Sequence, residues 1–513
     1  MSSPSEEERG RREAASERAG DASTSVGSRS GSGVDARAFE VEYDEYGEDG
    51  ADANGGEVTM ASVVALIVGS TVGAGALALP ASTAPAGIVP AGGALFAVWV
   101  MLVCDALLIA EVNLAMMRER DEERLIHGRG HSPVVIPLAD MAERTLGEKG
   151  QVIMNGIYAS VSLTILVAYI NKAGDLLEGV LHVDPAVAAT AFTVLLGGTV
   201  CFGGTRTADS INQALTYLCL AAFAALLAAG SYYADWGDAT WVGSPAAVSD
   251  AIPIIFLTLV FHDLVPVVCS YLNGDSTKIR SGILIGSLIP LAMFELWNTI
   301  ALAMAGGDAT KDPLDIISDD LGGAASALLG TFGVAALATS FIGCCLGISA
   351  ALQPFVEDAL FKFDEPEEEA RMTHALFKAM EKYDAERKSG APSVSRLLTF
   401  GGIITVPLVV AASFPNIFLP LTGFVGAYGM TIIYGVMPPL MALSMRREAQ
   451  KYGQAQPANG TPLPGGEPAL MALIASAVFI TLDKAYDDVS SFVGGGAGAG
   501  ASNVADVASL LQT

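Results

Sequence analysis

Apolar runs of about 20 residues recur along most of the chain, and they constrain its fold more than any other feature. A helix of that length, rising ~1.5 Å per residue, crosses the ~30 Å hydrocarbon core of a bilayer. Because the runs are continuous rather than alternating, they predict helices and not the strands of a membrane barrel. Only 16% of the residues are charged, against about 25% in soluble domains. The sequence therefore predicts an all-α polytopic membrane protein.

Eleven such runs can be delimited, and each predicts one transmembrane helix. The last is the weakest, because Asp483 and Lys484 interrupt it. The predicted spans are residues 58–81, 89–115, 150–173, 186–204, 211–233, 249–271, 281–304, 325–352, 397–414, 418–441 and 468–486.

The Lys and Arg residues predict how these spans are oriented. If the N-terminus lies on the cytosolic (or stromal) side, only Lys172, Lys311 and Lys484 of the 28 basic residues fall outside the segments of that side. The positive-inside rule assigns such segments to the cytosolic face, so we expect this orientation. The pattern leaves open whether the membrane is the plasma membrane, a chloroplast envelope or an internal vesicle.

Segments of different composition flank and interrupt the expected transmembrane domain over residues 58–486. Residues 1–57 are acidic, rich in Ser and Gly and poor in large apolar residues, which predicts a disordered tail. Residues 353–396 are expected to form a charged loop on the inner face, and residues 487–513 a Gly-rich tail. The net charge of −27 gives no indication of a nucleic-acid partner.

The six cysteines fall within or at the ends of predicted spans, and they lack the spacing of a metal site. We therefore expect buried apolar thiols, no metal and no cofactor. Ser, His and Asp groupings occur only within spans, so the sequence predicts no enzyme. The expected partners are the lipid bilayer and whatever solute the helices bind.

The stretch GSTVGAGALALP places a glycine cluster inside the first predicted span. Gly69, Gly73 and Gly75 each disfavour a helix by about 1 kcal/mol, and non-helical backbone in a membrane is tolerated where it lines a cavity or lies within protein. A broken span exposes N–H groups that attract a carboxylate, and Ser70 and Thr71 add hydroxyl groups. The alternative is close helix packing, which small residues at this spacing also favour.

The sixth span, AIPIIFLTLVFHDLVPVVCSYLNG, predicts a second break. Proline removes a backbone hydrogen bond, and an acid and a histidine inside a membrane are usually functional. Spans one and six are five helices apart. We therefore expect a five-plus-five inverted repeat with broken helices 1 and 6, plus one extra helix, and a substrate where the breaks meet. The interrupting residues are Phe261, His262, Asp263 and Pro266.

Three stretches carry a family resemblance: GSTVGAGALALP, the segment from AIPIIFLTLVFHDLVP to SGILIGSLIPL, and ALATSFIGCCLGI. They resemble the tyrosine/tryptophan permeases, the hydroxy and aromatic amino acid permease family of the amino acid–polyamine–organocation superfamily. The resemblance covers about residues 58–486. FHDLVP, with Asp263 in place of a small residue, is more similar to the plant and algal branch. The resemblance implies a proton-driven symporter of an amino acid, aromatic in character.

The resemblance also implies site residues. Gly69–Gly75 matches the break that binds the substrate carboxylate, and residues 261–263 match the break that receives the amino group. Thr339 and Ser340 match a position where sodium-coupled relatives ligate the cation, but proton-coupled members need no metal there, and no metal site is predicted. The polar candidates that the third span contributes near the substrate are Asn155, Tyr158 and Ser162.

Three residues are candidates for carrying the coupled proton. His262 is one, because imidazole titrates near neutrality, and Asp263 either fixes its tautomer or receives the substrate amine. Glu111 matches a family glutamate, with a loop-paired carboxylate as the alternative. Glu295 lies mid-span, where it titrates or pairs with a neighbouring asparagine on the same face. Neither Glu295 nor Asp105 has a counterpart in the family.

Two other classes of membrane protein are weighed against the symporter. A channel requires a polar stripe along one or more helices, whereas the polar residues here cluster at two breaks. An amino acid sensor resembling a transporter usually carries a large folded cytosolic extension, and residues 353–396 are too short and too charged for one. The sequence therefore favours a secondary transporter of an amino acid coupled to protons, with a sensor or a sodium-coupled symporter as the alternative.

Overall fold

The computed structural model describes residues 59–126, 135–305, 322–362, 394–452, 463 and 466–494. Within these ranges the secondary structure is entirely helical, and no strand is present. The predicted tail over residues 1–57 lies outside the described residues. So do most of the charged loop and most of the Gly-rich tail.

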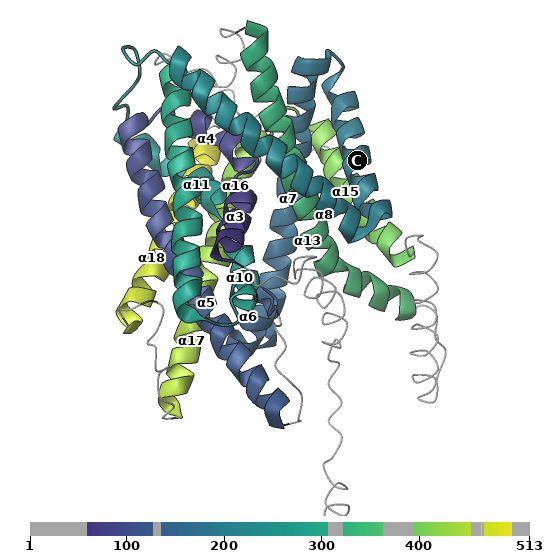
Figure 1. The fold of residues 1–513 in the computed structure, drawn as a ribbon, viewed down its shortest axis with the longest axis vertical. Coiled ribbons are helices and arrows are strands. Elements are labelled where there is room, and N and C mark those ends of the chain that lie inside the picture. The colour runs from purple at the N-terminus through teal and green to yellow at the C-terminus, as the bar shows by residue number, and fades with distance from the viewer. Residues whose placement is uncertain are drawn as a thin grey trace, which may run out of the picture. The chain divides into compact units, whose positions relative to one another are not determined.

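The chain forms a bundle of long helices with a few short ones between them (Figure 1). The first half contains α3 (Met60–Thr71), α4 (Gly75–Thr83), α5 (Ile88–Ile126), α6 (Leu138–Leu146), α7 (Glu148–Leu181), α8 (Pro185–Tyr233) and the 3-10 turn η1 (Pro245–Ala247). The second half contains α9 (Val248–Leu259), the 3-10 turn η2 (His262–Leu264), α10 (Val265–Tyr271), α11 (Ser276–Met304), α13 (Gly322–Lys362), α15 (Val394–Ser413), α16 (Phe418–Phe424), the π-helix η4 (Val425–Val436), α17 (Met437–Lys451) and α18 (Gly466–Gly494).

Ten helical segments of the described chain are long and apolar enough to cross a membrane, and the bent pair α3–α4 makes an eleventh. These segments coincide with the eleven predicted runs, so the prediction of an all-α polytopic protein is confirmed. α5 and α17 continue well beyond the predicted ends of their spans, to Ile126 and Lys451. The apolar run shows where a helix leaves the hydrocarbon. The helix itself continues into the water for as long as its i to i−4 backbone hydrogen bonds are formed.

Polar residues at the helix starts define several of the boundaries. Asp184 accepts hydrogen bonds from the backbone N–H groups of residues 186 and 187 at the start of α8, where Pro185 has no N–H group and needs no acceptor. Asp275 caps α11 in the same way. The tight connection before α11 places Asn273 and Gly274 at positive φ, a conformation that glycine and asparagine adopt most readily.

A cluster of buried aromatic side chains packs α4 into the bundle. The rings of Trp297 from α11, Phe223 from α8 and Phe332 from α13 lie 4.8–6.2 Å apart. The indole Nε1 of Trp297 donates to the carbonyl of Ala76, in the first turn of α4, at 2.9 Å. The cluster therefore joins three spans and holds the short second half of span one against them.

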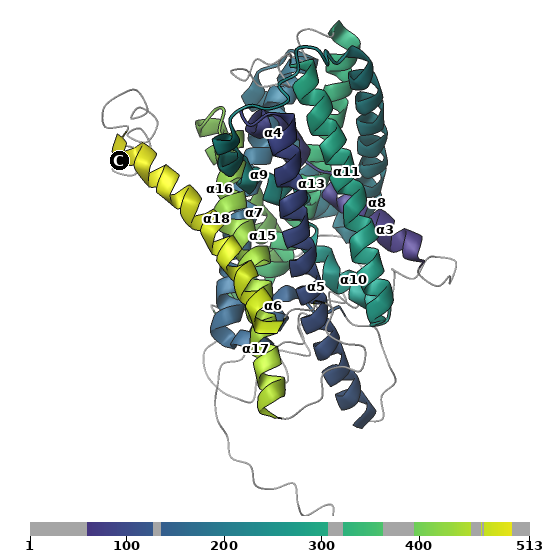
Figure 2. The ribbon, with the colours of Figure 1, turned by 90° about the vertical axis from the view of Figure 1, so that its left-hand side faces the viewer.

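α18 lies at the edge of the helices in Figure 2, where it runs at a steep angle to its neighbours. Only 11% of its apolar window is buried, the smallest share among the candidate spans. It packs mainly against η4 and α17. A helix with so little protein around it is well placed to face lipid.

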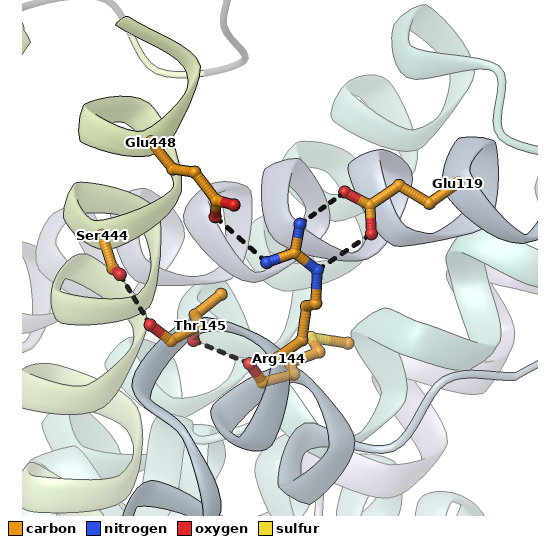
Figure 3. A network of polar contacts seen from close by, with 6 residues as sticks. Glu119, Arg144, Thr145, Ser444 and Glu448 are labelled. Carbon is orange, nitrogen blue, oxygen red and sulfur yellow. Dashed lines mark hydrogen bonds and ion pairs between the residues drawn. The ribbon is translucent and has the colours of Figure 1, made fainter. Parts of the chain in front are cut away.

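Arginine ion pairs connect the helix ends on the side predicted to be cytosolic, and two of these networks differ in burial. Arg144 of α6 donates to Glu119 of α5 and Glu448 of α17 at 2.9–3.0 Å, and these bonds raise the pKa of Arg144 (Figure 3). Arg446 of α17 instead forms a bidentate pair with Glu111 of α5, with both N–O distances at 2.7 Å. The side chains of the second pair are 11% exposed, against 36–48% in the first network.

This difference in burial leads to a stability prediction. Arg446→Met should lower stability by about 3 kcal/mol, because it leaves the largely buried Glu111 carboxylate without its counter-charge. Arg144→Met should lower it by about 1 kcal/mol or less, because water and salt screen the exposed network. Thermal unfolding of the purified variants in detergent measures both effects. Equal shifts in the two variants would contradict the assignment.

Candidate functional site

Span one is broken where the glycine cluster predicted a break. α3 ends at Thr71, α4 begins at Gly75, and their axes differ by 59°. Val72 has extended backbone angles (φ −78°, ψ 92°), so the break is a true interruption of the helix. The hydroxyl groups of Ser70 and Thr71 both donate to the carbonyl of Ile67, at 3.1 and 2.7 Å. In this conformation they therefore serve the end of α3 itself.

The glycines of the break allow two other spans to come close. A Cβ at Gly73 would lie 2.7 Å from Ser340 Oγ of α13, and a Cβ at Gly75 would lie 2.9 Å from Thr258 Cα of α9. A Cβ at Gly69 would meet Thr216 of α8 at 3.3 Å, a milder contact. Close packing and a broken helix, the two alternatives for this motif, are therefore both present.

Backbone donors remain available at the start of α4. The N–H group of Ala74 donates to Ser340 Oγ at 3.2 Å, whereas no hydrogen bond of the described chain involves the N–H groups of Gly73 or Gly75. Unpaired N–H groups at a helix N-terminus form a binding position for an anion. Their position suits the predicted role in holding a substrate carboxylate, which stays a prediction.

Span six is interrupted as well. α9 ends at Leu259, and Val260 and Phe261 have non-helical backbone angles before the short turn η2. α10 then begins with Pro266 in its first turn, where the missing N–H group has no helical partner to lose. Thr258 Oγ1, just before the interruption, donates to the carbonyl of Gly75 at 3.1 Å. This bond places the two breaks side by side.

His262 is completely buried between aromatic rings. Its ring centroid lies 5.0 Å from that of Phe261 and 5.1 Å from that of Tyr434. Its Nε2 lies 3.0 Å from the carbonyl oxygen of Leu102 in α5. A carbonyl only accepts, so Nε2 carries the hydrogen, and Nδ1 is a bare acceptor that has no partner among the described residues. His262 therefore links the second break to α5.

Asp263, the next residue, is exposed although it lies in the interruption of a membrane span. Its Oδ1 accepts a short hydrogen bond from the hydroxyl group of Tyr434, which is 1% exposed. Tyr434 belongs to the π-helix η4, which ends just before Pro438 and Pro439. Prolines displace the carbonyls one turn before them, and π-helical turns often occur at functional positions. Tyr434 is thus a site residue that the sequence pattern did not identify, and the adjacent proline pair was the signal.

The third span, α7, contributes polar side chains to the same interior. The Tyr158 hydroxyl group lies against Gly347 of α13, and Tyr169 of the same helix lies near Ser340 of α13. Ser162 is buried, whereas Asn155 is partly exposed. Tyr169 was not among the predicted residues, because a tyrosine in an apolar run reads as core.

The remaining candidates lie apart from the breaks. Thr339 donates to the carbonyl of Ala336 in its own helix at 3.0 Å. Glu295 of α11 lies against Gly92 of α5, and Asn298, its expected partner, instead accepts from Thr83 at 2.6 Å. Glu111 is the carboxylate described above that pairs with Arg446 of helix α17 rather than with a loop residue. Within the described chain, no group of three or more His, Cys, Asp or Glu side chains is arranged to hold a metal.

Two interrupted spans whose breaks touch, with free backbone donors at one and an exposed carboxylate at the other, define a polytopic membrane protein with a polar interior site. The sequence model of the tryptophan/tyrosine permease family matches residues 57–483. That range includes both breaks and all eleven spans except the last residues of α18. The chain therefore belongs to the tryptophan/tyrosine permease family.

Three relatives from Haemophilus influenzae illustrate the similarity. Tyrosine-specific transport system 1 is 28% identical over 402 residues, which cover 75% of this chain and 87% of the relative. Tyrosine-specific transport system 2 is 31% identical over 319 residues, covering 56% and 71%. A tryptophan-specific transport protein is 26% identical over 426 residues, covering 76% and 88%.

The first break yields a prediction for Gly73. Gly73→Ala should reduce uptake about tenfold, because the added methyl group displaces Ser340 Oγ and separates it from the Ala74 N–H group. Gly343→Ala is the matched control, since a Cβ at that position of α13 meets nothing within 4 Å. Initial uptake rates, normalised to the amount of inserted protein, measure the effect. Unchanged uptake in Gly73→Ala would contradict the assignment of this break to the transport site.

The second break yields a prediction for Tyr434. Tyr434→Phe keeps the ring against His262 but removes the donor to Asp263, and hydrogen bonds to charged groups contribute about 1.5–3 kcal/mol. If Asp263 receives the substrate amine, the KM for uptake should rise about tenfold or more. Tyr428→Phe is the control, because Tyr428 of η4 donates to Asp488 at 2.8 Å away from the breaks. Equal KM values in both variants would contradict a role for Tyr434 at the site.

Proposed function

We propose that this chain is a secondary active transporter that moves an amino acid of the aromatic class across a membrane by proton symport. Family membership and the tyrosine- and tryptophan-specific relatives support the class of substrate. The interior position of the two breaks supports the transport mode, because a site between the spans suits alternating exposure to the two sides of the membrane.

One observation carries the proposal: the paired breaks present opposite chemistry within one interior. The N–H groups of Gly73 and Gly75 suit a carboxylate, and the exposed carboxylate of Asp263 suits an ammonium group. The contact between Thr258 and Gly75 keeps these two features adjacent. An α-amino acid has both complementary groups, a carboxylate and an ammonium, attached to the same carbon atom.

Aromatic side chains around the breaks support a substrate with a ring. Phe261, Tyr434, Tyr158 and Tyr169 come from three different spans and surround the region that residues 261–263 and Ser340 define. Aromatic rings pack favourably against one another in offset or tilted arrangements. A substrate such as tyrosine or tryptophan therefore has suitable partners for its side chain.

Protons rather than sodium are the proposed coupling ion. The family resemblance implies proton coupling, and at the cation position of sodium-coupled relatives Ser340 Oγ accepts the Ala74 N–H group, which uses one lone pair of that oxygen. We also propose the inverted five-helix repeat and an N-terminus on the cytosolic or stromal side, which the positive-inside rule supports.

Reconstituted protein tests the function directly. Proteoliposomes should take up labelled tyrosine, tryptophan or phenylalanine in preference to alanine or glutamine, and should accumulate them when the outside is acidified. Accumulation should disappear with a protonophore and persist when sodium is replaced by choline. Binding without accumulation would favour a sensor, whereas strict dependence on sodium would favour the sodium-coupled alternative.

A further inference from the structure

Asp105 of α5 is the most unusual polar residue of the described spans. It is 0% exposed, and neither of its carboxylate oxygens has a hydrogen-bond partner in the part of the chain that the structure describes. Buried polar atoms are nearly always bonded, and an isolated ionised carboxylate in an apolar interior is several kcal/mol unfavourable. In this conformation the Asp105 carboxyl group is therefore protonated and neutral.

The position of Asp105 along α5 connects it with the second break. Leu102, three residues earlier, supplies the carbonyl that accepts from His262 Nε2 at 3.0 Å. Met101, four residues earlier, reaches η4, where its Cε lies 3.2 Å from a Cβ built at Gly435. Residues three and four apart share one face of a helix. Asp105 therefore lies one turn along α5 from the residues that contact the span-six interruption and the π-helix.

The other carboxyl groups of the membrane interior have different surroundings. Glu111 is paired with Arg446, Asp263 is exposed and bonded to Tyr434, and Glu295 is partly exposed beside Gly92. No cation reaches Asp105 in any ion pair of the described residues. The titratable and charged side chains on the elements packed against this part of α5 are His262 and Asp263 of η2, Asp250 of α9, Cys269 and Tyr271 of α10, Glu295 of α11, Tyr434 of η4 and Arg446 of α17, with Cys104 adjacent on α5 itself.

We propose that Asp105 is the proton-binding residue that couples uptake to the pH gradient, an inference that rests on the proposed proton symport. Asp105 holds its proton while α5 is packed against η2 and η4. It releases the proton when this contact opens to water on the other side of the membrane. The Leu102–His262 bond transmits that opening to the substrate site, which makes His262 a positioning residue rather than the carrier.

The charge balance of the cycle follows from this assignment. A zwitterionic amino acid carries no net charge, so one proton on Asp105 makes each inward cycle move one positive charge. At one proton per substrate, a gradient of one pH unit supports about tenfold accumulation. Asp105→Asn, which resembles the protonated carboxyl group in shape, should leave the carrier permanently in its neutral form.

The experiment uses full-length protein in proteoliposomes containing a pH-sensitive dye. Asp105→Asn should retain exchange of external labelled tyrosine for internal tyrosine. Its accumulation ratio under a pH gradient should fall from about tenfold to about one, and substrate should no longer acidify the lumen. Asp483→Asn in α18 is the matched control, because it makes the same change at another carboxyl group within a span; it should behave as wild type.

The outcomes separate the inference from the proposed function. If tyrosine accumulation by the wild-type protein does not depend on the pH gradient, the proposal of proton symport is wrong. If the wild type is proton-coupled and Asp105→Asn still accumulates tyrosine and acidifies the lumen, Asp105 is not the coupling residue. Should Asp105→Asn fail to fold, Asp105→Glu decides: a shifted pH dependence of uptake supports the assignment, and an unchanged one overturns it.

Discussion

The constraint on which this structure depends is that backbone groups inside the membrane cannot form hydrogen bonds to water. In hydrocarbon every N–H and C=O group must find a partner within the protein, so an interrupted helix survives only where neighbouring spans enclose it. Both interruptions meet this condition here. Ser340 of α13 and Thr258 of α9 bond to the first, and the carbonyl of Leu102 in α5 holds His262 at the second. The long, regular spans are the support that permits two irregular ones.

The polar side chains follow the same rule, because they too need partners within the protein. Arginine and glutamate pairs connect α5, α6 and α17 near their ends, where water screens the more exposed network. Deeper in the bundle, hydroxyl groups mostly donate to carbonyls of their own helix, as Thr339 does. Against this background Asp105 stands out, because both of its buried carboxylate oxygens lack a hydrogen-bond partner among the described residues, whereas Asp263 is exposed and bonded to Tyr434.

The breaks also explain why small residues lie where they do. Gly73 and Gly75 bring span one within contact of α13 and α9, and this approach places the two interruptions together. Trp297 then bonds to Ala76 and fixes the start of α4 against the aromatic cluster. Packing and function therefore use the same residues, since the close approach creates the interior in which free donors and a carboxylate meet.

The sequence by itself determined the number of spans, most of their limits and the location of both breaks, although α5 and α17 continue beyond their predicted ends. Those features depend on hydrophobic run length and on glycine and proline, which act on the local backbone. It also determined the family, since GSTVGAGALALP and FHDLVP lie within the matched region.

Only the tertiary structure decided which residues meet. That Tyr434 bonds to Asp263, that Arg446 pairs with Glu111 and that Asp105 has no partner follow from contacts between helices more than a hundred residues apart, or from their absence. An apolar run records that a helix lies in the membrane, but not which of its faces meets which neighbour. That choice is made by side-chain packing across the bundle, where lipid and protein are equally apolar and hydropathy no longer distinguishes them.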